Sequence, residues 1–336
     1  MSKIYIPLPA KKIIPLYLQQ DFDGFFVGIE GLSSNFNSYI ARDEVKDLTK
    51  SIKDKDIYIC LNRLYFNNEI DSVKDFLISI KDLDITGICY TDIGVLNILN
   101  EIGYDKDILW YSNHIGTNSE TINFLGKRGV SKVLLSSEIT AYEIKMIIKN
   151  SSLRIGAELY GFLNMATSSR KLLSNYFEQI DEKKEKEKYY IKDKVKEGTY
   201  FLVEDKNTNF FTNKVLNGIK FFPELIDSNI DFIFLDDYML NENNFYNIIE
   251  AFSSLRKAYD DKEFVSKLEQ VVDVNTYYDT FYGFLDKKTV YKVEDYGKNW
   301  VTCTCRRFRA LKMGMFIWCR CSLFRRRKIF FKSECN

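Results

Sequence analysis

Polar side chains, most of them carboxylates and amides, follow short apolar runs repeatedly between the N-terminus and Asp237. They are Asn62, Asp92, Asn113, His114, Glu138, Glu158, Tyr160, Asp236 and Asp237. Carboxylates and imidazoles are common general acids and bases in enzymes. The candidate catalytic residues are therefore Glu138, Asp92 and His114.

The same residues argue against two classes of hydrolase. His114 is the only histidine and no G-x-S-x-G sequence is present, so a serine hydrolase is not expected. A single histidine cannot supply H-E-x-x-H or another paired-histidine zinc site. We therefore expect no metal site in this set.

Each candidate also has a purely structural interpretation. His114 is typical of a hydrogen-bonding residue in a loop or at the mouth of a barrel. Asp92 and Glu138 each precede an amphipathic stretch, where a carboxylate can cap a helix. Both interpretations stay open from the sequence.

For two pairs of residues, the sequence predicts whether the side chains are buried or solvated. Asp236 and Asp237 are adjacent, and burying both would be costly without a proton, a cation or hydrogen-bond donors. We therefore expect at least one of them to be solvated. Cys60 and Cys89 lie within apolar runs, so they are predicted to be small core residues.

Eight short apolar or β-branched runs are the predicted strands that position these side chains. They cover residues 4–8, 24–29, 57–61, 85–90, 108–112, 132–135, 154–160 and 232–235. Between them, stretches such as 70–82, 94–102, 120–128 and 140–150 repeat apolar residues three and four apart, which indicates amphipathic helices. Eight βα units predict an α/β fold, a (β/α)8 TIM-like barrel, with an open doubly wound sheet as the alternative.

The seventh unit carries a long insertion, and a short extension follows the barrel. The insertion holds the charged run DEKKEKEKYYIKDKVKEG and a predicted hairpin around YFLVEDKNTNFFTN. A helix over 241–260 is expected to close the barrel, followed by a short helix near 264–272 and an extended segment in GFLDKKTVYKVED. The predicted domains are a barrel over 1–260, an extension over 261–299 and an aberrant tail over 300–336.

The tail differs from the body in composition. The net charge is +1, but residues 300–336 contain 10 Lys and Arg against one acid, Glu334, and hold 5 of the 7 cysteines. Its C-T-C and C-R-C pairs are a weak zinc signal, and its RRRK run is a nonspecific basic patch.

With only 4 prolines, no long apolar run and no secretory signal pattern, the chain is expected to be cytoplasmic and not embedded in a membrane.

Several strings in this order resemble the peptidase U32 family, also called collagenase-like proteases. The strings are GFFVGIE, TDIGVL, LLSSEIT, ELYGFLNMATSSRKLLSNYF, YFLVEDKNTNFFTNKVL, FIFLDD and GFLDKKTVYKV, which together cover residues 1–293. The segment 158–177 is the most specific. In family members with chemistry, a pattern like H-G-x-x-C-x-x-x-S-x-R-C-L-L-S-N-Y supplies two of four iron-sulfur ligands.

The resemblance places other residue types at the ligand positions. Tyr160 stands for the histidine, Asn164 for the first cysteine and Lys171 for the second. The positions of the third and fourth cysteines would fall in or just before the charged run, and no cysteine occurs there. An amide and an ammonium cannot replace thiolates. The resemblance therefore implies no cofactor in this chain, and an iron-sulfur cluster in a partner. The usual Lys-Glu-Gly-Arg string at strand eight is also altered here.

In the family, cysteine-free members occur beside a cysteine-bearing paralogue, and such pairs are linked to oxygen-independent hydroxylation. One example is the prephenate-dependent formation of 5-hydroxyuridine at the tRNA wobble position. The resemblance thus implies a non-cluster partner subunit of a tRNA-hydroxylating pair, with tRNA and prephenate as possible ligands. The alternatives are a peptidase acting alone and a barrel that binds a small molecule.

The predicted binding residues come from the best-matched segment and from the barrel mouth. They are Asn62, Tyr160, Arg170, Asn175 and Tyr176. For Arg170, Asn175 and Tyr176 we predict a position at the barrel mouth, in contact with a partner or with RNA phosphates. The alternative is that these three only brace the loop.

A shift of reading frame explains the tail. Read one nucleotide further on, the codons from Thr302 to Arg309 permit L-A-P-A-G-D-L-E, and those from Trp318 to Glu334 permit G-A-D-A-V-Y-L-G-G-E-K-F-F-L-K-A-N. Both strings resemble the start of a full-length U32 protein. We expect the tail from about Tyr296 to overlap the start of a downstream gene for the cysteine-bearing paralogue, by natural overlap or by a frameshift.

Overall fold

The structure, a computed structural model, describes residues 2–111, 114–186, 188–192 and 199–288. Residues 2–288 belong to one compact unit. The predicted tail over 300–336, most of the extended segment before it, and Asn113 lie outside the described residues.

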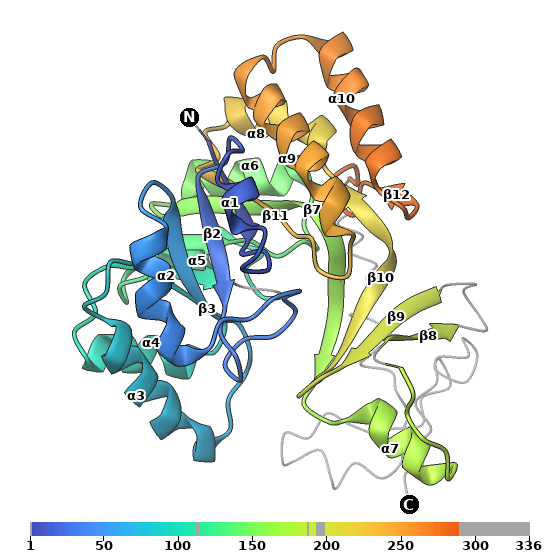
Figure 1. Ribbon diagram of the computed structural model, residues 1–336. Helices are drawn as coiled ribbons and strands as arrows, with labels where there is room; N and C mark the ends of the chain where they lie inside the picture. The colour runs from blue at the N-terminus through green and yellow to red at the C-terminus, as the bar shows by residue number, and fades with distance from the viewer. Residues whose placement is uncertain (1, 112–113, 187, 193–198, 289–336) are drawn as a thin grey trace, which may run out of the picture. The chain divides into compact units, whose positions relative to one another are not determined.

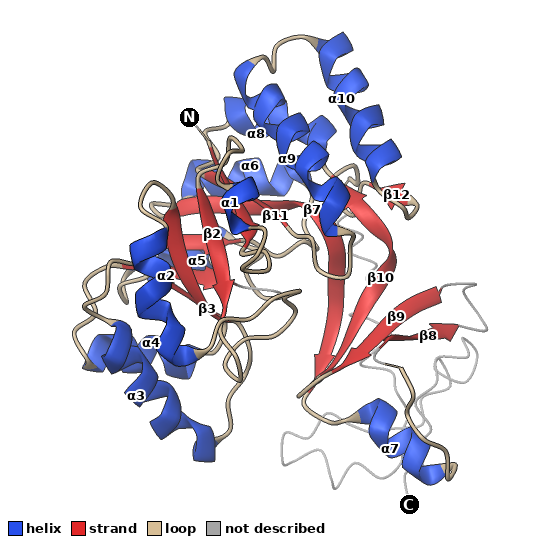
Figure 2. Ribbon diagram, viewed as in Figure 1, coloured by secondary structure: helices blue, strands red, loops and turns tan. Residues whose placement is uncertain are grey.

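Eight parallel strands close into a barrel (Figures 1 and 2). They are β1 (Lys3–Pro7), β2 (Gly24–Gly28), β3 (Asp56–Leu61), β4 (Gly87–Tyr90), β5 (Asp107–Tyr111), β6 (Lys132–Leu134), β7 (Arg154–Ser168) and β11 (Phe232–Leu235). Each of β1 to β7 pairs with the next, and β11 pairs with both β1 and β7. The predicted (β/α)8 barrel is confirmed, because this last pairing closes the sheet.

Alternation along each strand fills two apolar layers. In β3, Tyr58 and Cys60 belong to the smaller apolar cluster inside the barrel, whereas Ile57 and Ile59 belong to the larger cluster. Side chains of a strand point alternately to opposite faces, so both faces of each strand are buried. Cys89 joins Cys60 in the interior, and the prediction that both cysteines are core residues is confirmed.

Helices follow most of the strands and supply the outer part of the large cluster. They are α1 (Ile14–Tyr17), α2 (Val45–Ser51), α3 (Ile70–Ile80), α4 (Ile93–Glu101), α5 (Ser119–Gly126), α6 (Ala141–Asn150), α8 (Phe222–Asp227), α9 (Glu242–Lys257) and α10 (Lys262–Asn275). In α3 the buried residues are Val73, Phe76, Leu77 and Ile80, which are spaced three and four apart. None of the described helices is long and apolar enough to cross a membrane.

A buried cation closes the end of the barrel where the strands begin. Lys132 is 4% exposed, and its Nζ lies 3.2 Å from Asp107 Oδ2 and 3.3 Å from the Tyr5 hydroxyl. The ammonium also donates to the Tyr58 hydroxyl, which in turn donates to Asp107 Oδ2 at 2.8 Å. Arg154 forms a second ion pair with Asp107. This network satisfies the polar groups below the apolar interior.

The seventh strand continues well beyond the barrel, which the sequence did not predict. β7 runs on from the expected end at Tyr160 to Ser168, and it pairs there with the antiparallel β10 (Thr208–Asn217). β10 pairs with β9 (Thr199–Glu204), and β9 with β8 (Lys188–Lys192). The predicted hairpin is confirmed as β9 and β10. We call residues 161–217 the lobe; it includes α7 (Leu172–Gln179) (Figure 1).

A buried carboxylate attaches α7 to the sheet of the lobe. Glu204 on β9 accepts hydrogen bonds from the backbone amides of Leu173, at 2.7 Å, and Ser174, at 3.1 Å. Its carboxylate also accepts from Thr208 Oγ1 at 3.0 Å and pairs with Lys184 at 3.2 Å. Although burial opposes it, this set of donors lowers the pKa of Glu204 to about 2. The start of α7 is therefore fixed to β9 by an internal anion.

The extension after the barrel differs in part from its prediction. The expected short helix is the longer α10, whose start is capped by Asp261. The short strand β12 (Thr280–Phe281) then pairs with β10. Residues 283–286, predicted to begin an extended segment, form turns instead, and Gly283 there has a φ of 61°.

Candidate functional site

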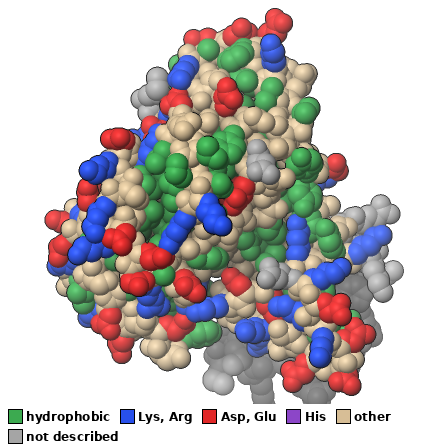
Figure 3. Space-filling view, viewed as in Figure 1, with side chains coloured by type: hydrophobic (Ala, Val, Ile, Leu, Met, Phe, Trp, Pro, Cys, Tyr) green, Lys and Arg blue, Asp and Glu red, His purple; other side chains and the backbone are tan. Residues whose placement is uncertain are grey.

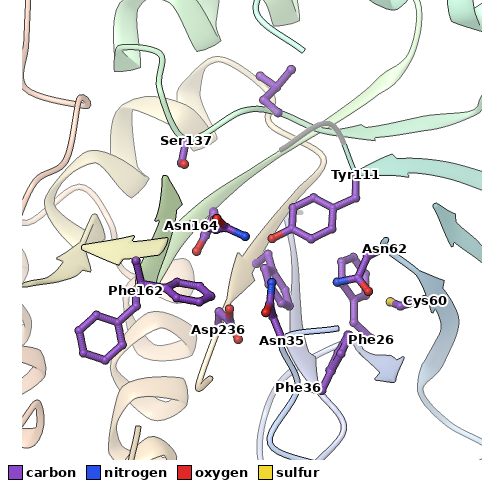
Figure 4. A pocket seen from close by; sticks show the side chains of 14 residues that line it. Phe26, Asn35, Phe36, Cys60, Asn62, Tyr111, Ser137, Phe162, Asn164 and Asp236 are labelled. Atoms are coloured by element: carbon purple, nitrogen blue, oxygen red, sulfur yellow. The ribbon is translucent and has the colours of Figure 1, made fainter. Parts of the chain in front are cut away.

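A cavity lies where the barrel mouth meets the base of the lobe (Figure 4). Its walls are aromatic, and its polar groups are amides, hydroxyls and carboxyls. The lining residues are Phe26, Asn35, Phe36, Cys60, Asn62, Tyr111, Leu135, Ser137, Glu158, Phe162, Asn164, Phe211, Phe234 and Asp236. The free volume inside is about 20 Å³, enough for about one water-sized group.

Two carboxyl groups face this cavity from neighbouring strands. Glu158 on β7 pairs in register with Phe234 on β11, and Asp236 follows directly after β11. Burial raises the pKa of Asp236 to about 7, and burial together with Asp236 raises the pKa of Glu158 well above its usual range. Gly161 allows this approach, because a Cβ there would lie 2.8 Å from the Cβ of Asp236. Burial therefore favours the protonated form of both carboxyl groups.

The structure contradicts our expectation that at least one of Asp236 and Asp237 is solvated. Asp236 is 8% exposed and Asp237 only 2%. Asp236 Oδ1 accepts from the backbone amide of Tyr238 at 3.0 Å, whereas Asp237 Oδ1 is buried without a partner among the described residues. Burial, with Asp236 nearby, raises the pKa of Asp237 well above its usual range. Bound protons, and not solvent, thus relieve the repulsion.

Two amide oxygens at the cavity lack hydrogen-bond donors within the described part of the chain. They are Oδ1 of Asn35 and Oδ1 of Asn164, both buried. The Asn164 amide donates to Thr167 Oγ1 at 3.1 Å, which fixes the side chain with its oxygen free. Figure 4 shows both asparagines directed toward the space that Tyr111 and Asp236 also face. Burial, followed by Glu158 and Asp236, raises the pKa of Tyr111.

Two predicted residues have structural roles at the mouth. Asn62 lines the cavity, but its amide bonds both backbone groups of Ser34, at 3.0 and 2.9 Å, and so braces the loop after β2. Asp92 caps α4 by accepting from Gly94, at 2.8 Å, and it also accepts from the Tyr65 amide at 3.0 Å. Both therefore position loops.

The structure brings His114 and Glu138 together. Nδ1 of His114 lies 3.6 Å from Oε1 of Glu138, with the side chains 33% and 46% exposed. The suggestion that Glu138 caps the next helix is wrong, because Thr140 caps α6 and forms a capping box with Glu143. A catalytic role for the pair stays a prediction.

The other predicted binding residues lie away from the cavity. Tyr160 is buried, and its hydroxyl shares a 2.9 Å hydrogen bond with Thr276 Oγ1, which ties β7 to the end of α10. Arg170, Asn175 and Tyr176 are exposed, at the far end of the lobe. We expected these three at the barrel mouth, and that position is wrong because the eight extra residues of β7 carry them roughly 25 Å further.

The sequence did not identify Asn35 and Tyr111 as cavity residues. Tyr111 is the last residue of β5 and lies within the predicted strand 108–112, with no signal that marks it as a cavity residue. Asn35 belongs to an irregular loop and has a φ of 62°. Asparagine tolerates this left-handed conformation better than most residues, and that was the only signal available.

Comparison of the sequence with models of protein families identifies the family of this chain. The model for peptidase family U32 matches residues 17–292. The chain belongs to peptidase family U32. This confirms the resemblance found in the sequence, and the match runs from the end of α1 through the rest of the barrel, the lobe and the extension to residue 292.

Two curated U32 relatives from Bacillus subtilis (strain 168) are similar to the chain. One, tRNA hydroxylation protein P2, is 26% identical over 306 residues, which are 85% of this chain and 97% of the relative. The other, tRNA hydroxylation protein P1, is 21% identical over 292 residues, which are 82% of this chain and 69% of the relative. The chain thus spans nearly all of P2 and about two thirds of P1.

The residues at the U32 ligand positions do not suit an iron-sulfur cluster. Asn164 uses its amide within the lobe, and Lys171 is exposed before α7. Cys60 and Cys89, the only cysteines in the matched region, are buried inside the barrel. No group of three or more metal-ligating side chains occurs among the described residues. We derive no chemistry through a cluster in this chain.

Anaerobic reconstitution tests whether the chain can bind an iron-sulfur cluster. After incubation with iron and sulfide and removal of unbound metal, the protein should retain far less than one cluster per chain, because thiolates are missing at both positions. Iron and sulfide content and the visible absorption spectrum are the measurements. The variant lacking residues 300–336 removes the tail cysteines, and a stoichiometric cluster in that variant would contradict the prediction.

Proposed function

We propose that this chain is a non-cluster partner subunit in the 5-hydroxylation of the tRNA wobble uridine. It would act with a cysteine-bearing U32 paralogue, which supplies the iron-sulfur cluster. The observation that carries the proposal is the similarity along nearly the whole length of tRNA hydroxylation protein P2, combined with an amide and an ammonium at the ligand positions.

The lobe is the part of the chain that best suits contact with RNA. Arg170, Lys171 and Tyr176 are exposed there, and Tyr176 is 56% exposed. Arginine and lysine pair with phosphates, and an exposed aromatic ring can stack on an unpaired base. Figure 3 shows positive and negative side chains interspersed over the face in view. On that face, a few specific side chains, and not a broad positive field, would therefore carry the contact.

The described cavity does not suit prephenate, which carries two carboxylates. No lysine or arginine lines it, and its free volume is far below that of such a molecule. We therefore place the prephenate site of the pair on the cysteine-bearing paralogue. Downstream encoding of that paralogue remains our prediction from the tail.

The test is the 5-hydroxyuridine content of tRNA, measured by mass spectrometry of digested nucleosides. Deletion of this gene should abolish the modification in a strain without other hydroxylating systems, and the wild-type gene should restore it. Restoration should also require the paralogue. Restoration without the paralogue would contradict a supporting role.

A double variant tests the contribution of the lobe. Arg170→Ala/Tyr176→Ala should lower the 5-hydroxyuridine content at least tenfold without changing the thermal unfolding temperature. The matched control is Arg128→Ala/Tyr142→Ala, which removes an exposed arginine from the turn after α5 and an exposed tyrosine from α6. Full modification by the lobe variant would refute this placement of RNA contact.

The peptidase alternative rests on the proximity of His114 and Glu138. A hydrolytic base needs a nucleophile within hydrogen-bond reach, and no hydroxyl or thiol bonds to His114 within the described residues. The highly purified chain should therefore not cleave gelatin. Cleavage that is abolished by His114→Ala or Glu138→Gln would favour the peptidase.

A further inference from the structure

The barrel-mouth cavity gathers two carboxyl groups and several other hydrogen-bonding groups, and no cationic side chain lines it. Glu158, Asp236 and Tyr111 reach it from β7, from the end of β11 and from β5. Its lining contains no lysine, arginine or histidine. Buried acids without a cation are costly when ionised, so a ligand that carries a positive charge would be strongly favoured there.

The acceptors match an ammonium group in number. An ammonium donates three hydrogen bonds and accepts none. Asn35 Oδ1 and Asn164 Oδ1 are buried and lack donors among the described residues, and the carboxyl pair supplies the third acceptor. A water molecule would satisfy part of this set, but only a cation would also allow a carboxyl group to ionise.

The walls and the size of the cavity restrict which cationic group could bind there. Phenylalanine rings line it, and cations are attracted to the faces of such rings; the rings are those of Phe26, Phe36, Phe162, Phe211 and Phe234. The free volume of about 20 Å³ admits a group the size of water, which an ammonium is and a planar guanidinium is not. The geometry thus favours the end of a lysine side chain.

The residues around the barrel mouth favour a protein as the molecule that bears this ammonium group. Four large apolar side chains are exposed on the loops that follow β3, β4 and β5, namely Leu64 at 57%, Phe66 at 61%, Ile93 at 51% and Ile115 at 63%. The first two loops are joined by the hydrogen bond from Tyr65 to Asp92. Exposed apolar residues around a polar pocket are typical of protein interfaces.

We propose that the barrel mouth is the docking site of the partner subunit, which inserts one lysine side chain into the cavity. The ammonium is held by Asn35, Asn164 and the Glu158–Asp236 pair, while Leu64, Phe66, Ile93 and Ile115 pack against the surrounding partner surface. This inference rests on the proposed function, because it takes the cysteine-bearing paralogue as the partner.

The test is the Kd of the purified paralogue for the chain and its variants, measured by isothermal titration calorimetry. Glu158→Gln/Asp236→Asn keeps the size of both groups but prevents ionisation, so the variant should fold normally and bind at least tenfold more weakly. Asp75→Asn/Glu250→Gln is the matched control, because it removes two exposed carboxylates from α3 and α9. Its Kd should match that of the wild type.

A second variant and a partner scan complete the test. Phe66→Ala/Ile93→Ala leaves the cavity intact and should also weaken binding at least tenfold. One lysine of the paralogue, changed to methionine, should weaken binding to the wild type but have no further effect on binding to Glu158→Gln/Asp236→Asn. These results together would identify the inserted side chain.

The outcomes separate this inference from the proposed function. If the paralogue binds the wild type and both site variants with Kd values within threefold, the docking site is refuted while the partnership stands. If it fails to bind the wild type at all, the partnership and the docking site are both refuted. If only the rim variant weakens binding, the mouth is the interface but the inserted lysine is refuted.

Discussion

Replacement of Lys132 by alanine should destabilise the protein by about 3–5 kcal/mol, the cost of breaking a buried ion pair. The side chain is 4% exposed, and its loss would leave two buried hydroxyls and Asp107 with fewer partners. Equilibrium unfolding in urea, followed by circular dichroism, measures the change.

Lys132→Met is the matched control for lost volume. It keeps most of the apolar contact with the Tyr5 and Tyr58 rings, whose centroids lie 5.5 and 4.8 Å from Nζ, but it removes the charge. We expect a smaller loss than for alanine, because methionine fills most of the space that alanine would leave empty. A loss below about 1 kcal/mol for Lys132→Ala would show that the network does not hold the barrel end together.

The second large effect concerns pH. Asp237 has a pKa that burial raises in the folded state, so the folded protein binds a proton that the unfolded chain releases above about pH 4. Where the folded state binds more protons, the free energy of unfolding falls as the pH rises. Asp236, with a pKa raised to about 7, contributes in the same direction between about pH 4 and pH 7.

Asp237→Asn should therefore stabilise the protein at pH 8, by about 1 kcal/mol or more, a large effect for a single substitution. It should have little effect near pH 3, below the ordinary aspartate pKa of about 3.9, because Asp237 is then largely protonated in both states. Urea unfolding of both proteins at pH 3, 6 and 8 provides the comparison. Equal stability at every pH, or destabilisation that grows with pH, would contradict a protonated Asp237.

The barrel could be predicted because its strands repeat one local signal. In β3 and β4, apolar residues occupy both faces, and this pattern depends little on what lies elsewhere in the chain. The continuation of β7 carries no such signal, since residues 164–168 are largely polar and exposed. Their strand conformation depends on pairing with β10, more than forty positions later.

Part of the candidate site could also be predicted from the sequence, and part could not. Glu158 and Asp236 follow from the rule that functional groups gather where barrel strands end. Asn35 comes from a loop whose path is set by tertiary contacts, including the bond between Ser34 and Asn62. The protonation of the carboxyl pair also requires knowing the depth of burial, which the sequence does not contain.

The pairing at the base of the lobe has a consequence for how this architecture can diverge. Tyr160 and Asn217 are partners across β7 and β10, so the segment between them leaves and re-enters the barrel at adjacent points. Closure of the barrel needs only the portion of β7 that contacts β6 and β11, all of it before Gly161. An excursion with neighbouring ends can lengthen or shorten at a small entropic cost, since that cost grows only with the logarithm of length. Natural variation can therefore change the length and surface of the lobe while the enclosing barrel stays the same.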